Sequence, residues 1–134
     1  MKYIFAAIVL TLMFTTPVAG DVLKDSDRML CVPGAVSHCV LGDGCNTGLP
    51  EEENIPEFIE VDLQRNTLAT TRASGENRST PIRNQSRAAG YLYLHGVENG
   101  RGFSMVISES TGDLTFVVAA DGETAAMFGS CTPD

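Results

Sequence analysis

The chain has 134 residues, and 17 acidic residues against nine basic ones give a formal net charge of −8 at pH 7. This length allows one domain with a modest core. The acidic excess excludes sequence-independent binding to nucleic acid, which depends on basic side chains that neutralise phosphates, and it favours cationic partners instead.

Residues 1–20 have the pattern of a secretory signal peptide. Lys2 gives a positive start, Ile4–Phe14 is apolar, and Val18–Gly20 supplies small residues before a cleavage site. The apolar run is shorter than the roughly 20 residues of a transmembrane helix, and no later stretch is as apolar over that length. We therefore predict a secreted or periplasmic protein that has no stable membrane insertion after cleavage; an uncleaved anchor is the alternative.

Residues 21–56 form an acidic, cysteine-rich segment, in which Gly42–Pro50 has the composition of a loop and Glu51–Glu53 that of a solvated linker. An even number of cysteines after a signal peptide predicts disulfides. The four cysteines are Cys31, Cys39, Cys45 and Cys131. Three pairings are open, and in each of them Cys131 ties the C-terminal strand to the N-terminal segment while the other two cysteines close a short loop.

A zinc site that uses His38 with these cysteines is the alternative to disulfides. Structural zinc sites usually bring their ligands in close pairs, and this spacing is absent here. We therefore expect no metal and no cofactor.

Residues 57–134 predict an antiparallel β-meander that forms one domain with residues 21–56. Apolar and polar residues alternate along five stretches, and glycine-containing turns follow one another at the spacing typical of a β-sandwich or barrel. The predicted strands are Glu57–Gln64, Tyr91–His95, Phe103–Ser108, Leu114–Val118 and Thr124–Ser130. Residues 66–89 read as a long polar surface connection with one edge strand, Thr67–Arg72. The predicted fold is mainly β, a single small antiparallel sheet, sandwich or barrel whose N-terminal segment is held by disulfides.

Five arginines lie in a stretch that contains a single acid, Glu76. They are Arg65, Arg72, Arg78, Arg83 and Arg87. Arginine makes bidentate contacts with carboxylates and phosphates, so one hypothesis is an anion-binding or partner-binding loop. The other, which we favour, is a solvated connection whose arginines pair with the protein's own acidic strands.

The sequence contains no constellation typical of catalysis. No G-x-S-x-G motif is present. Glu60 and Asp62 alternate with apolar residues as on the polar face of an ordinary strand, and without an apolar pocket their carboxyl groups have no reason to divide into acid and base. His95 reads as a surface or interface residue. We predict that the protein is not an enzyme.

A resemblance can be drawn from the signal peptide, the three clustered cysteines, the strand Phe58–Leu63 and the closing Phe128–Thr132. Together they resemble small secreted proteins of Gram-negative bacteria, which implies an exported setting and a β-rich fold but transfers no site. In size, secretion, disulfides and acidity the chain is also similar, as a class, to periplasmic β-barrel inhibitors of lysozyme and proteases. Ala73–Gly75 resembles the Ser-Gly segment of lysozyme inhibitors, but the tyrosine and lysine-glycine elements expected afterwards are not in place.

These observations predict a non-catalytic secreted or periplasmic binding protein, with inhibition of a cationic enzyme as one form of that function. The alternative is a small β-barrel that carries an apolar ligand; an unrecognised hydrolase ranks below both. The carrier hypothesis needs the inward-facing apolar rows to enclose space rather than fill a core. Those rows are Leu92, Leu94, Phe103, Met105, Ile107, Phe116 and Val118.

Overall fold

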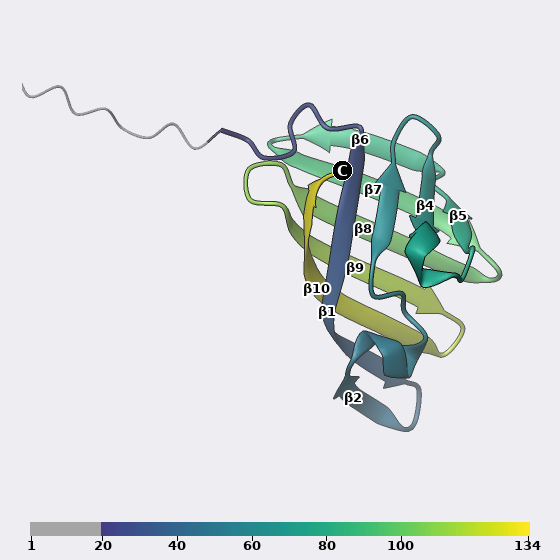
Figure 1. Ribbon diagram of the computed structural model, residues 1–134. Coiled ribbons are helices and arrows are strands. Elements are labelled where there is room, and N and C mark those ends of the chain that lie inside the picture. Colours follow the sequence, from purple (N-terminus) through teal and green to yellow (C-terminus); the bar gives the residue numbers. More distant parts are fainter. Residues whose placement is uncertain (1–19) are drawn as a thin grey trace, which may run out of the picture.

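The computed structural model describes residues 20–134; the signal peptide predicted for residues 1–20 therefore lies, apart from Gly20, outside the described residues. Within them, ten strands form one curled antiparallel sheet, a half-barrel (Figure 1). The strands are β1 (Arg28–Val40), β2 (Gly44–Gly48), β3 (Ile59–Asp62), β4 (Thr67–Thr70), β5 (Ser79–Pro81), β6 (Asn84–Ala88), β7 (Tyr91–Glu98), β8 (Arg101–Ser108), β9 (Asp113–Ala120) and β10 (Glu123–Pro133). Two short 3₁₀ helices, η1 (Pro50–Glu53) and η2 (Arg72–Ser74), complete the fold.

The sheet confirms the predicted fold class and corrects several boundaries. Its strand order is β5-β4-β3-β1-β10-β9-β8-β7-β6, with β2 paired to β1 beside this path. The predicted loop Gly42–Pro50 contains β2, the predicted linker Glu51–Glu53 belongs to η1, and the predicted surface connection contains β5 and β6. The cysteine-rich segment contributes the longest strand, β1, which lies in the middle of the sheet.

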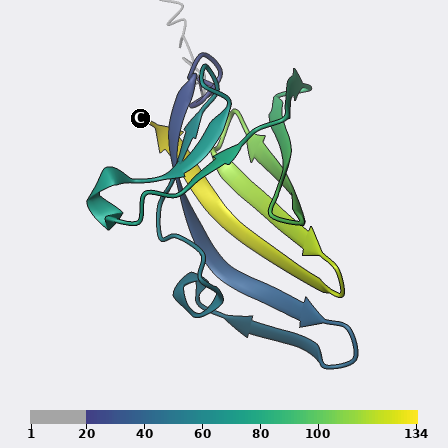
Figure 2. The same cartoon turned by 90° about the vertical axis from the view of Figure 1, so that its right-hand side faces the viewer.

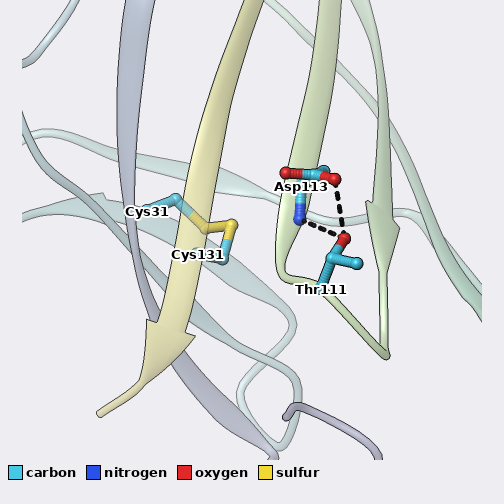
Figure 3. Close-up of a disulfide and its surroundings, with 4 residues drawn as sticks. All are labelled: Cys31, Thr111, Asp113 and Cys131. Atoms are coloured by element: carbon cyan, nitrogen blue, oxygen red, sulfur yellow. Dashed lines mark hydrogen bonds between the residues drawn. A yellow bond between two sulfur atoms is a disulfide. The ribbon is translucent and has the colours of Figure 1, made fainter. Parts of the chain in front are cut away.

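The disulfides join Cys31 to Cys131 and Cys39 to Cys45. The first bond therefore ties β10 to the N-terminal segment and the second closes a short loop, as predicted. Each bond joins residues that lie directly opposite each other in an antiparallel ladder. The turn between β8 and β9 covers the Cys31–Cys131 bond: Figure 3 shows Thr111 and Asp113 beside it, and the amide of Cys131 donates to the carbonyl of Gly112 at 2.8 Å.

A β-bulge in β1 decides which side chains face inward. Gly34 and Ala35 together oppose Phe128 of β10, because the register shifts between Pro33 and Val36. The extra residue reverses the alternation, since a shift of one position moves every following side chain to the other face. Met29 and Cys31 are inward before the bulge, and Val36 and His38 are inward after it. Cys39 consequently lies on the face opposite to Cys31, although the two are an even number of residues apart.

Beyond the bulge, β1 stays paired with β10 on one side and takes β2 in place of β3 as its neighbour on the other. Its first part pairs with β3 and its last part, Val36–Val40, pairs with β2. The β1–β2 hairpin, closed by Cys39–Cys45, therefore projects from the half-barrel, and η1 packs beside it (Figures 1 and 2). Leu41 at its tip is 86% exposed.

The two ends of the sheet, β5 and β6, are joined in the chain by Ile82 and Arg83 alone. No ladder pairs β5 with β6, so the sheet curls without closing. The Ile82 amide donates to the Asn66 carbonyl, and the Arg83 amide donates to the His95 carbonyl, both at 2.8 Å. We call the boundary between the two edge strands, β5 and β6, the seam; the chain itself crosses it at Ile82 and Arg83.

Strand β7 continues past its predicted end at His95 and contains Gly96. A Cβ atom at Gly96 would overlap the ring of Phe103, its neighbour on β8, and the carbonyl oxygen of Pro81. The glycine therefore leaves room for the aromatic ring and lets the seam segment approach β7. The turn itself is made by Asn99 and Gly100, both with positive φ.

The core occupies the concave side of the sheet. Leu92, Leu94, Met105 and Ile107 are each at most 2% exposed. Leu23, from the segment before β1, is 1% exposed and packs in the same core. In residues 20–134 no helix is both long and apolar enough to cross a membrane.

Candidate binding cleft

A cleft of about 250 Å³ opens on the concave side of the half-barrel, near the β7–β8 turn and the base of the β1–β2 hairpin. Its floor is apolar. Phe103 and Phe116 lie on adjacent strands and make an edge-to-face pair with ring centroids 5.9 Å apart. The other apolar floor residues are Ile55, Ile59, Leu68, Val118, Ala125 and Met127.

The apolar rows named in the carrier hypothesis divide between core and cleft. Leu92, Leu94, Met105 and Ile107 fill the core. Phe103 and Phe116 are 9% and 8% exposed, Val118 is half-buried, and all three line the cleft. One part of the half-barrel is thus packed solid, while the other leaves an open, apolar space.

Polar side chains surround this floor, and they come both from strands and from η1 and the segments beside η1 and β5. Glu98 and Arg101 face each other at the end of the β7–β8 ladder, and Glu123 opens β10. Thr80 of β5 donates its hydroxyl to Glu98 Oε2 across the seam. The remaining polar side chains at the mouth are those of His38, Glu53, Asn54, Thr70, Arg78 and Thr124.

His38 lies between two carboxylates on one wall of the cleft. Its Nδ1 is 2.9 Å from Glu53 Oε2 and its Nε2 is 3.4 Å from Glu123 Oε2. Glu53 reaches this position because η1 follows the β1–β2 hairpin and packs against β1.

Within the part of the chain that the structure describes, the contacts of His38 do not include a nucleophile. In residues 20–134, His38 has no hydroxyl or thiol among its hydrogen-bond partners, and all four cysteines are in disulfides. Likewise, no group of three or more histidine, cysteine, aspartate or glutamate side chains in that range is placed to hold a metal ion. The arrangement is suited to binding a group with a polar end and an apolar body.

The five arginines singled out in the sequence do not gather at the cleft; of them, Arg78 alone lines it. Its Nη1 donates to the Asn54 carbonyl at 3.0 Å and is 4.0 Å from Glu76 Oε2. Arg65 is 3.7 Å from Asp62. Arg72 lies in η2, and Arg83 lies between β5 and β6.

Arg87 of β6 holds the segment that precedes β1. Its guanidinium donates to the carbonyls of Lys24 at 2.9 Å and Ser26 at 2.8 Å, and it also contacts the Glu109 carboxylate. The Leu23 amide in turn donates to the Glu109 carbonyl at 2.9 Å. This arginine therefore contacts the protein's own chain, and Leu23 is held in the core at the same place.

Sequence reasoning missed most of the cleft residues. His38 was considered as a zinc ligand, and His95 was interpreted as a surface or interface residue; His95 is exposed in the structure. The signal available for Glu98 and Arg101 was their position on either side of Asn99-Gly100, but their inward orientation depends on a register that only the folded sheet defines.

Comparisons with protein-family models, with curated proteins and with solved structures gave no significant match.

Proposed function

We propose that this chain is a non-catalytic binding protein of a secreted or periplasmic setting, and that its cleft holds a small ligand with an apolar body. The observation that carries the proposal is the cleft of about 250 Å³, whose floor is built on the Phe103–Phe116 pair. Ligand pockets are typically concave and mostly apolar, with a few polar groups that orient the ligand. This cleft is smaller than the roughly 300–1,000 Å³ of drug-sized pockets, so the ligand is a small one.

The division of the interior supports binding over simple core filling. Inward residues at the packed end are sealed from solvent, whereas the floor at the open end meets a mouth of charged and hydroxyl side chains. An interior that served stability alone would be expected to fill this space, because protein cores pack at close to crystal density. The open, apolar volume is therefore assigned to a ligand.

Two features support the non-catalytic, exported character of the proposed function. Each ring nitrogen of His38 already faces a carboxylate, which leaves it poorly placed to take a proton from a substrate. The two disulfides are typical of proteins that work in oxidising compartments.

The test is binding of an uncharged phenyl-naphthylamine dye, whose fluorescence rises in an apolar site. We expect saturable binding to the oxidised protein and its loss in Ala125→Leu, because Ala125 faces the cleft. Ala126→Leu is the matched control, since the neighbouring side chain on β10 points to the other face of the sheet. Absence of saturable binding, or equal binding by both variants, would contradict the proposal.

A second candidate function is recognition of a cationic protein, which includes inhibition of a cationic enzyme. The observation that favours it is the exposure of apolar residues on the hairpin: Leu41 at its tip is 86% exposed, and Leu49, which precedes the acidic Glu51 and Glu52 of η1, is 60% exposed. A salt-sensitive capture of one cationic enzyme, lost in Leu41→Ser, would support this function. Capture that is unchanged by Leu41→Ser would count against the hairpin as its site.

A further inference from the structure

The mouth of the cleft carries more negative than positive charge. Arg78 is set against Glu76 and the Asn54 carbonyl. Apart from that arginine, the ionisable side chains of the mouth are Glu53, Glu98, Glu123, His38 and Arg101. Three carboxylates thus share one guanidinium and one imidazole.

Glu98 is the carboxylate of the three that has no basic nitrogen within 4.0 Å in residues 20–134. His38 lies within 3.4 Å of both Glu53 and Glu123. Arg101 Nη2 is 3.9 Å from Glu123 Oε1, even though Arg101 stands opposite Glu98 in the β7–β8 ladder. Within residues 20–134 Glu98 forms no ion pair, and its partner is the Thr80 hydroxyl.

The position of Glu98 makes this charge useful to a ligand. The residue is half-buried, faces inward as the last residue of β7, and lines the same cleft as the Phe103–Phe116 pair. A partly desolvated carboxylate is stabilised by a cation that donates a charge-assisted hydrogen bond to it. A ligand carboxylate at the same place would instead meet three like charges.

We propose that the ligand of this cleft is a small amine, whose ammonium group binds at Glu98 and Thr80 while its apolar stem lies on Phe103 and Phe116. This inference rests on the proposed function and names its ligand class. The carboxylates at the mouth supply the counter-charge for the ammonium group. The apolar floor supplies a surface that a bare metal ion or a polyamine would not use.

Three probes with the same alkyl stem separate head-group recognition from apolar binding. Octylammonium, octanol and octanoate, all below their micelle concentrations, are titrated against the dye-loaded oxidised protein. We expect octylammonium to displace the dye at a concentration about ten-fold or more below that of octanol, a difference of about 1.4 kcal/mol, because a charge-assisted hydrogen bond is roughly twice as strong as a neutral one. Octanoate is expected to be the weakest of the three.

Variants test whether Glu98 causes the preference for octylammonium over octanol. Glu98→Gln keeps the side chain's shape and removes its charge, so it should abolish the preference for the amine while leaving octanol binding unchanged. Glu60→Gln is the matched control, because Glu60 alternates with the buried Ile59 and Val61 and lies outside the cleft. Thr80→Val gives a second variant and should reduce the preference in part.

The outcomes separate this inference from the proposed function. If octanol displaces the dye as well as octylammonium does, or if Glu98→Gln retains the preference, the amine assignment is wrong while apolar binding in the cleft stands. If neither the dye nor any of the three probes binds, the proposed function and the amine assignment both fail.

Discussion

Cys31 and Cys131 face each other directly across the β1–β10 ladder, and their bond joins two residues 100 positions apart in the chain. Both side chains are buried, at 0% and 2% exposure. The bond closes a loop that contains nearly the whole folded chain, and it holds together the two strands that form the middle of the sheet.

Removing this bond is expected to destabilise the protein severely. On the chain-entropy model a loop of this length contributes about 4.7 kcal/mol, against about 2.4 kcal/mol for the short loop closed by Cys39–Cys45. The double variant Cys31→Ala/Cys131→Ala should therefore lose about twice as much free energy of unfolding as Cys39→Ala/Cys45→Ala. Chemical denaturation of both variants measures their free energies of unfolding. Equal losses would contradict the larger stabilisation that we assign to the Cys31–Cys131 bond.

The two disulfides should also differ in access to reductants. Cys45 is exposed and Cys39 half-exposed on the projecting hairpin, whereas the other bond lies in the core. Thiol exchange requires access to the sulfur, so brief treatment with a mild phosphine followed by alkylation should label Cys39 and Cys45 first. Mass spectrometry of the labelled peptides checks this, and simultaneous labelling of all four cysteines would argue against a buried clamp.

Gly112 is expected to tolerate no side chain. Its φ is +79°, and an added Cβ would overlap the carbonyl oxygen of Cys131. Gly100, with φ of +77° and open space around it, is the matched control. Gly100→Ala should cost about 1–2 kcal/mol from the left-handed backbone alone, and Gly112→Ala about 1–3 kcal/mol more from the overlap. Equal free energies of unfolding would contradict the close contact shown in the structure.

Arg87 is expected to stabilise the fold through the segment that precedes β1. Arg87→Ala removes charge-assisted hydrogen bonds to Lys24 and Ser26 and leaves the Glu109 carboxylate, which is 11% exposed, without its partner. The loss should be about 2–4 kcal/mol, and Arg87→Lys should recover only a part because an ammonium lacks the planar fork. Arg83→Ala, at an exposed position, should change stability by at most about 0.5 kcal/mol.

The sequence was informative where residues alternate without interruption. The strands from Tyr91 to Ser130 and the division of cysteines between one long and one short loop follow from periodicity and from counting. Strand β1 was missed because Pro33 and Gly34 interrupt it and the bulge reverses its alternation. A search for strict alternation of apolar and polar residues does not detect such a reversal.

The cleft could not be predicted for the same physical reason. His38 faces inward only because of the bulge, and Glu53 reaches it only because a predicted linker forms η1. Glu98 and Thr80 meet across a seam that joins non-neighbouring strands. Each contact depends on tertiary register and not on local sequence.

The most direct test of the central claim is to map where octylammonium binds, by titrating it into isotope-labelled, oxidised protein and following the amide signals by NMR. We expect saturable shifts at Glu98, Phe103, Phe116 and Ala125, and none on the opposite face around Phe128, which is 72% exposed. Shifts centred on Phe128, or no saturable shifts at all, would contradict the claim that the cleft is the binding site.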